Sequence, residues 1–199
     1  MYRVLDMCLD AGLAGILMAP IFYLFHKRYF HNAKQTVWCF ILAVYLAGVY
    51  AVVGLPDICY VRPDFNVNLR PFAYMFSDYR SSTLNVLLFM PLGLLLTVLW
   101  KPFRKVHRTV LFGFCTSLLI ELLQLFTLRA TDVNDLMTNT FGCLLGWCLG
   151  RLVLLLFPKI RQSEETEEIY LSCCLSFAIM FFLEPFLSNL LFEWIARIQ

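Results

Sequence analysis

The chain has 199 residues, of which 60% are hydrophobic and only 15% are charged, and its formal net charge is +2. Soluble domains usually carry about 25% charged residues, so the composition argues against a soluble globular protein. The small net charge, without a basic stripe interleaved with aromatic residues, sets aside a nucleic-acid partner. The apolar residues come in long runs, and roughly 17–25 such residues suffice to cross a bilayer. The sequence therefore predicts an integral membrane protein.

Six apolar runs predict an all-α fold, a polytopic transmembrane helix bundle of about six spans. In chain order the spans cover residues 7–25, 37–55, 83–100, 109–128, 132–157 and 169–192. The first contains Asp10 and Pro20, and its acidic residues are unlike a signal peptide, so we expect it to be retained. The sixth contains Glu184 and Pro185, where the proline should kink the helix.

Lysine and arginine residues are denser in alternate short loops, which indicates the orientation of the chain. They predict cytoplasmic loops after the first, third and fifth spans, with both termini outside; these loops contain Lys27, Arg28, Lys34, Lys101, Arg104, Lys105, Arg108, Lys159 and Arg161. We expect three parts: the first span and its loop (1–36), a four-helix membrane core (37–157), and an acidic linker with the sixth span (158–199).

The sequence contains no standard catalytic or cofactor-binding pattern. Most of the eight cysteines lie in apolar runs and none form a CxxC pair, so neither a disulfide framework nor a zinc site is expected. The histidines, His26, His31 and His107, fall in predicted cytoplasmic loops, which removes a Ser-His-Asp triad from any outward pocket. We therefore expect no cofactor and no bound metal.

The strongest functional signal lies in the fourth and fifth spans. At 100° per residue, polar and small residues fall within an arc of about 80° on each helix. These residues are Gly113, Ser117, Glu121 and Gln124 on one helix, and Asp132, Asp135, Asn139, Gly142, Gly146 and Gly150 on the next. The turn between the helices is short, so the two faces should meet. The glycines should let another helix approach closely.

An ionisable residue inside a membrane span is a functional-site hypothesis by default. Glu121 and Asn139 should lie roughly 10 Å below the turn, with Arg129 near the mouth. The predicted site is an outward polar pocket that binds a ligand through Asn85, Ser117, Glu121, Gln124, Arg129, Asp132, Asp135 and Asn139. Asp10 and Glu184 should lie at a similar height. Glu121 and Asp135 are the candidates for a general acid or base.

Structural roles for the same residues remain open. Asp132 and Asp135 have the spacing of an N-cap and its third residue. Glu121 could pair with Arg129 or hydrogen-bond Asn139. Other open structural roles are an interface hydrogen bond for Asn85, pairing of Glu184 with groups freed by Pro185, and close packing or a bend at Pro91, Gly93 and the other glycines.

Four ordered motifs resemble the VanZ-like family over residues 37–151. They are Asn68-Leu-Arg-Pro-Phe72, Asn85-Val-Leu-Leu-Phe-Met-Pro-Leu-Gly93, Ser117-xxx-Glu121-xx-Gln124, and Arg129-xx-Asp132-xx-Asp135-xxx-Asn139-xx-Gly142. Family members are small polytopic membrane proteins, mostly of Gram-positive bacteria. The family is named for an accessory protein that lowers susceptibility to teicoplanin.

The resemblance implies a multi-pass protein of the bacterial cytoplasmic membrane and cell envelope, but it implies no reaction. We expect the protein to contact membrane lipids and to bind an amphipathic ligand of the outer leaflet. That ligand would be either a lipid-linked wall precursor or a lipoglycopeptide. Two alternatives stay open: a structural scaffold, and an enzyme acting on a lipid-linked substrate with Glu121 or Asp135 as acid and base. The sequence does not indicate the oligomeric state.

Overall fold

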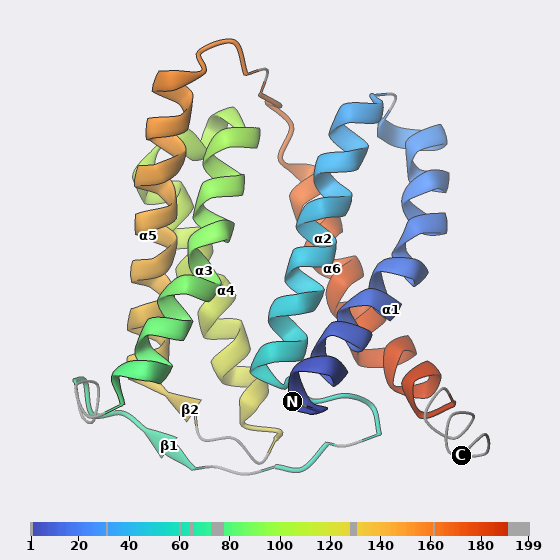
Figure 1. Ribbon diagram of the computed structural model, residues 1–199, viewed down its shortest axis with the longest axis vertical. Coiled ribbons are helices and arrows are strands. Elements are labelled where there is room, and N and C mark those ends of the chain that lie inside the picture. The colour runs from blue at the N-terminus through green and yellow to red at the C-terminus, as the bar shows by residue number, and fades with distance from the viewer. Residues whose placement is uncertain are drawn as a thin grey trace. The chain divides into compact units, whose positions relative to one another are not determined.

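The structure is a computed structural model that describes residues 2–30, 32–59, 61–63, 66–72, 78–127, 131–160 and 162–190. Six of its helices are long and apolar enough to cross a membrane, which confirms the predicted all-α fold. The helices are α1 (Tyr2–Phe25), α2 (Ala33–Val53), α3 (Tyr79–Leu99), α4 (Val106–Gln124), α5 (Val133–Leu156) and α6 (Glu167–Ala178), the last continuing to Leu190 (Figure 1).

Short elements join these helices. They are the π-helices His26–Phe30 and Ile179–Leu183, the 3-10 helix Lys101–Arg104, and the two-residue strands β1 (Val67–Asn68) and β2 (Thr131–Asp132). The chain divides into two compact units. The first comprises Met1–Arg62 and Glu167–Gln199, and the second comprises Pro63–Thr166.

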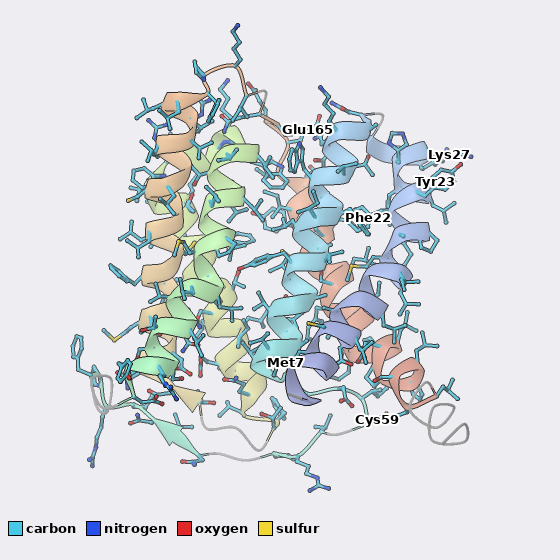
Figure 2. The ribbon with its side chains drawn as sticks, viewed as in Figure 1. Met7, Phe22, Tyr23, Lys27, Cys59 and Glu165 are labelled. Atoms are coloured by element: carbon cyan, nitrogen blue, oxygen red, sulfur yellow. The ribbon has the colours of Figure 1, made fainter. Side chains whose placement is uncertain are left out.

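The first unit packs α1, α2 and α6 around apolar side chains. Phe22 of α1 meets Phe40 of α2 edge to face at 5.6 Å, and the Lys27 ammonium lies 4.9 Å from the centre of the Tyr23 ring (Figure 2). Between α2 and α6, the buried Glu168 accepts hydrogen bonds from Gln35 Nε2 at 2.6 Å and from Cys39 Sγ at 3.6 Å. These bonds give a buried carboxylate the partners that burial requires.

Where the sequence predicts a kink in the sixth span, the structure has a π-helical turn that ends at Leu183, two residues before Pro185. Proline has no N–H, so the carbonyl of Phe181, four residues earlier, loses its helical partner. The Ile58 amide, from the segment after α2, donates to that carbonyl at 3.1 Å. For this carbonyl, a main-chain amide takes the role that was considered for the Glu184 side chain.

In the second unit, α3 and α5 run side by side at a distance that only glycine permits (Figure 1). A Cβ at Gly93 would overlap the carbonyl of Cys143, and one at Gly142 would overlap the main chain of Val86. A Cβ at Gly146 would likewise overlap the carbonyl of Met90 on α3. The prediction that these glycines serve close packing is confirmed, and α3 is the helix that approaches.

Helix α4 packs against the neighbouring side of α5, as the meeting of the two polar faces predicts. Asn139 Nδ2 donates to Ser117 Oγ at 2.9 Å, and both side chains are buried. One turn further from the loop, Cys143 Sγ contacts the main-chain oxygen of Thr109 at 3.4 Å, beside Gly113. The buried face of α4 therefore carries the small and polar residues of the predicted arc.

The other end of this unit is closed by the segment after α5. Gln162 Nε2 donates to the carbonyls of Thr97 at 2.7 Å and Val98 at 2.9 Å, near the end of α3. Lys101 pairs with Glu164 at the exposed surface, and its ammonium holds the pKa of that carboxyl below the usual value. These contacts satisfy carbonyls that a helix end leaves without partners.

The glycine contact generates a stability prediction. Gly146→Ala should lower the free energy of unfolding by about 1–3 kcal/mol, because the added methyl group must push α3 away from α5. Gly12→Ala in α1 is the control, since nothing lies within 4 Å of its Cβ position. Denaturant unfolding of the purified protein in micelles would measure both. An unfolding midpoint for Gly146→Ala equal to that of the wild type would contradict the packing described.

Candidate functional site

The turn between α4 and α5 is built around the Glu121 carboxylate, which is only 4% exposed. The Asp132 amide donates to Glu121 Oε2 at 2.9 Å, and Thr131 Oγ1 donates to the Glu121 main-chain oxygen at 3.0 Å. Of the structural roles left open for Glu121, the hydrogen bond to Asn139 is not formed, because Asn139 pairs with Ser117. Arg129, the other partner considered, lies outside the described residues.

Asp132 is the N-cap of α5, which confirms the capping interpretation for this residue. Its Oδ1 accepts from the Asn134 amide and from Asn134 Nδ2, both at 2.8 Å. Asp135 lies in the first turn of the same helix, where a negative charge is favoured by the helix dipole. The second oxygen, Asp132 Oδ2, accepts from Asn68 Nδ2 at 3.1 Å. One side chain thus caps a helix and holds a distant loop.

That loop, residues 66–72, docks on the turn along its length. Strands β1 and β2 pair in parallel, with Val67 opposite Thr131 and Asn68 opposite Asp132 (Figure 1). At the far end of the loop, the Phe72 amide donates to Asn134 Oδ1 at 2.7 Å. The loop therefore belongs to the site, although the predicted set of site residues contains none of it.

Sequence reasoning missed Asn68, Phe72 and Asn134 as site residues. Asn68 and Phe72 were visible as the ends of one family motif, but 64 residues separate Asn68 from Asp132 and nothing local indicates that they meet. Asn134 had a weaker signal, since an Asn two residues after an N-cap Asp lies within reach of it. Its two contacts with the loop, from the Phe72 amide and to the Arg70 carbonyl, could not be deduced from that spacing.

The loop also presents apolar side chains at its surface. Leu69 is 74% exposed and Phe72 is 59% exposed, and Arg70 between them is also exposed. Phe72 has φ = 61°, a left-handed conformation that costs a residue other than glycine of order 1–3 kcal/mol. The hydrogen bond to Asn134 helps to hold it. Exposed apolar residues at the end of a membrane bundle can enter the headgroup layer.

The buried polar atoms that have no hydrogen-bond partner among the described residues include Asn139 Oδ1 and Asn85 Nδ2, deeper in the unit. The interface hydrogen bond considered for Asn85 is therefore not made by its amide nitrogen within the described chain. Buried polar atoms are normally paired. Each of these two atoms is available to bond a water molecule or a polar group of a ligand.

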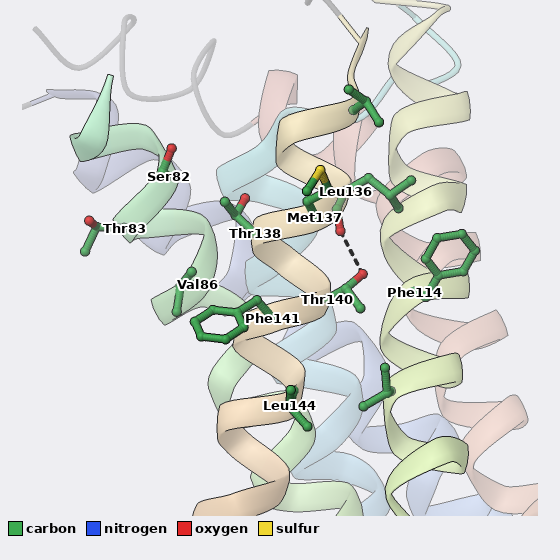
Figure 3. Close-up of a pocket in the computed structure, with 12 residues that line it drawn as sticks. Ser82, Thr83, Val86, Phe114, Leu136, Met137, Thr138, Thr140, Phe141 and Leu144 are labelled. Carbon is green, nitrogen blue, oxygen red and sulfur yellow. Dashed lines mark hydrogen bonds between the residues drawn. The ribbon is translucent and has the colours of Figure 1, made fainter. Parts of the chain in front are cut away.

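A groove of about 850 Å³ crosses the outer face of α5 between α3 and α4 (Figure 3). Its lining is almost entirely apolar and includes Val86, Val110, Phe114, Met137, Phe141 and Leu144. The Thr140 hydroxyl in its wall donates to the Leu136 carbonyl at 2.7 Å, so this polar group is already satisfied. One end of the groove reaches Val133, the residue after the N-cap Asp132.

Much of the predicted site falls into two hydrogen-bonded groups at the α4–α5 contact, Ser117 with Asn139, and Glu121 with Asp132 and Asn134; together we call them the polar cluster. Gln124 is buried at the end of α4, and Asn85 lies on α3 of the same unit. Asp10 and Glu184 belong to the first unit. Within the described part of the chain, no three His, Cys, Asp or Glu side chains are arranged to hold a metal ion.

The model of the VanZ/LLP1 family matches residues 12–156, which is more than half of the chain. The chain belongs to this family. It is also 38% identical over 82 residues to Protein VanZ of Enterococcus faecium, an alignment that covers 41% of this chain and 50% of that protein. The chain thus spans about half the length of this curated relative. No solved structure matches the chain. The resemblance stated from the four motifs is confirmed.

The capping geometry generates a second prediction. Asp132→Ala should lower the free energy of unfolding by about 1–2 kcal/mol through loss of the cap and should free residues 66–72, because Asn68 also loses its partner. Amide hydrogen exchange in residues 66–72 should accelerate. Asp132→Asn should be milder, since its side-chain oxygen can still accept from the Asn134 amide.

Asp78→Ala is the matched control, because Asp78 caps α3 through the Ser81 amide. It removes an N-cap and leaves the hydrogen bonds of residues 66–72 to Asp132 and Asn134 in place. Exchange in those residues that is unchanged by Asp132→Ala, or equally accelerated by Asp78→Ala, would contradict the docking role of Asp132.

Proposed function

We propose that this multi-pass membrane protein binds an amphipathic ligand of the outer leaflet. The acyl tail lies in the groove across α5, and the polar head lies at the end where α5 begins. The observation that carries the proposal is the groove itself, an apolar space of about 850 Å³ with one end beside the N-cap of α5. Ligand pockets typically enclose about 300–1,000 Å³ and are mostly apolar with a few polar groups.

The lining of the groove suits a hydrocarbon chain. Phe114 and Phe141 stand on its two sides, and Leu136, Met137 and Leu144 extend it along α5 (Figure 3). A polar ligand would leave its hydrogen-bonding groups unsatisfied against these side chains, which is costly. An acyl chain has no hydrogen-bonding groups to leave unsatisfied there, and it can enter from the surrounding bilayer.

The polar end of the site suits a head rich in hydroxyl and amide groups. Asn139 Oδ1 offers an acceptor and Asn85 Nδ2 offers a donor, neither with a partner among the described residues. Arg70 on the docked loop is exposed, and arginine pairs well with phosphate. A lipid-linked wall precursor or a lipoglycopeptide combines such a head with an apolar tail.

Membership of the family and the likeness to Protein VanZ support a setting in the bacterial cytoplasmic membrane. We propose that the chain acts in the envelope of a Gram-positive cell and lowers its susceptibility to teicoplanin. A ligand held in the outer leaflet would lie on the side where glycopeptides meet wall precursors. Gln124, Arg129 and Asp135 keep their predicted place in this site as part of the proposal.

A scaffold role is the second candidate, because the cluster makes many of its bonds within the protein. Glu121, Asp132 and Asn134 all bond main-chain groups of the turn or loop. Glu121→Gln separates the two functions, since glutamine still offers an oxygen to the Asp132 amide but carries no charge. If the role is that of a scaffold, Glu121→Gln should keep its function and Glu121→Leu should lose it, and the loss of function should follow the loss of folding stability. A binding site that uses the charge should lose function with both.

The groove gives the third prediction. In a Gram-positive host, the wild-type chain should raise the inhibitory concentration of teicoplanin but not that of vancomycin. Leu144→Trp should abolish that protection, because the indole fills the groove without invading a packed core. Susceptibility is measured at matched membrane levels of each variant.

Leu155→Trp is the matched control on the same helix, at a lipid-facing position that is 74% exposed and does not line the groove. It should retain full protection. Equal protection by the wild type and both variants would count against tail binding in the groove. No protection by well-folded wild type would remove teicoplanin susceptibility from the proposed function.

A further inference from the structure

A second cavity lies within the first unit, where α2 ends and the sixth membrane helix bends. It holds about 130 Å³ and is lined by three carboxylates, Asp10 of α1, Asp57 after α2, and Glu184 after the π-turn. Cys59, two residues beyond Asp57, and Met7, near Asp10 on α1, lie at this end of the unit (Figure 2). In the predicted orientation this end faces the outside.

The segment after α2 is fixed over the cavity by its own backbone. Gly54 ends α2 with φ = 63°, and its amide donates to the Tyr50 carbonyl at 3.0 Å. The Asp57 side chain then accepts from the Cys59 amide at 2.7 Å, and the Ile58 amide bonds the Phe181 carbonyl that Pro185 leaves free. Because Pro185 has no N–H, the Phe181 carbonyl is free to accept from Ile58, and this bond holds the adjacent Asp57 beside the π-turn.

Glu184 presents at the acidic cavity one buried oxygen that no described residue satisfies. Its side chain is only 7% exposed, and its Oε1 has no hydrogen-bond partner among the described residues. Its carboxyl group lies close to that of Asp10, whose Oδ1 accepts from Ser188 Oγ at 3.5 Å. Like charges this close repel each other unless a proton or a cation lies with them. None of the described residues that line the cavity is basic.

Aromatic rings form the other side of the same cavity. Tyr50, Phe177 and Phe181 line it, with Tyr50 edge-on to Phe177 at 6.4 Å and Phe177 stacked on Phe181 at 5.6 Å. An aromatic face attracts a cation, and an ammonium group with alkyl substituents also gains from the apolar contact. Carboxylates opposed to aromatic rings suit an organic ammonium better than a metal ion. No metal-holding group of side chains occurs among the described residues.

We propose that this acidic–aromatic cavity binds an alkylammonium group, either of a soluble amine or of a lipid head. At ~30 Å³ per water molecule, 130 Å³ corresponds to roughly four waters. That space accommodates a methylated ammonium, while a longer substituent extends through the opening. Glu184, Asp10 and Asp57 neutralise the charge, and the rings of Tyr50, Phe177 and Phe181 contact the alkyl groups.

The test uses the full chain purified in a neutral sugar detergent, with choline as the probe. Saturation-transfer NMR should show choline methyl signals and a dissociation constant about tenfold lower than that of the uncharged isostere 3,3-dimethylbutan-1-ol. Glu184→Gln and Asp57→Asn should each weaken choline binding by about tenfold, since each removes one charge. Asparagine at position 57 can still accept from the Cys59 amide, so the turn is preserved.

Glu168→Gln is the control, because Glu168 is also a buried carboxylate of the sixth helix but pairs with Gln35. It should bind choline as the wild type does. Absence of choline binding, equal binding of the uncharged isostere, or displacement by sodium ions at equal concentration would each overturn the proposal. So would unchanged binding in both Glu184→Gln and Asp57→Asn.

A second arm identifies the source of the ammonium group. The protein is placed in vesicles of phosphatidylglycerol alone or mixed with phosphatidylethanolamine, and the choline signal is measured again. If the choline signal is lost only in the mixed vesicles, the phosphatidylethanolamine head has displaced choline, which supports the proposal with a lipid head as the occupant. A signal equal in both supports it with a soluble amine.

Discussion

The hydrogen bond from the Asp132 amide to the Glu121 carboxylate joins the end of α4 to the start of α5. Because the carboxylate is buried, losing this partner would leave a charge without compensation, and bonds to charged groups contribute about 1.5–3 kcal/mol. The same turn places Asp132 as a cap for α5 and as the partner of Asn68. The buried Glu121 therefore holds α4 and α5 together. Its partner Asp132 in turn holds the loop 66–72, which is distant in sequence.

The close contact of α3 with α5 complements this turn. With α3 held against glycines on one side of α5, and α4 bonded through Ser117 on another, the outer face of α5 stays uncovered between them. The groove is the space that remains. In a bilayer it meets acyl chains, and its Val133 end adjoins the polar turn. The packing that stabilises the unit thus also shapes the site that we propose for a lipid tail.

Six spans, the meeting of the α4 and α5 faces and the N-cap at Asp132 could be predicted from sequence, because helical periodicity and capping are local. The partner of Glu121 could not, since several polar groups lay at similar depth and only the turn geometry selects the Asp132 amide. The groove could not be predicted from the sequence, because nothing distinguishes Phe114, Phe141 and Leu144 from ordinary lipid-facing residues. Asp10 and Glu184, predicted at the height of Glu121, meet each other in the first unit, and only the bend at Pro185 places Asp57 beside them.

Photo-crosslinking with a phospholipid that carries a diazirine in its acyl chain tests the central claim most directly. Mass spectrometry of the labelled full chain in vesicles would locate each adduct. The account predicts that adducts concentrate on Phe114, Phe141 and Leu144, and that Leu144→Trp removes them while Leu155→Trp does not. Adducts spread evenly over the exposed helix faces, with no excess in the groove, would contradict it.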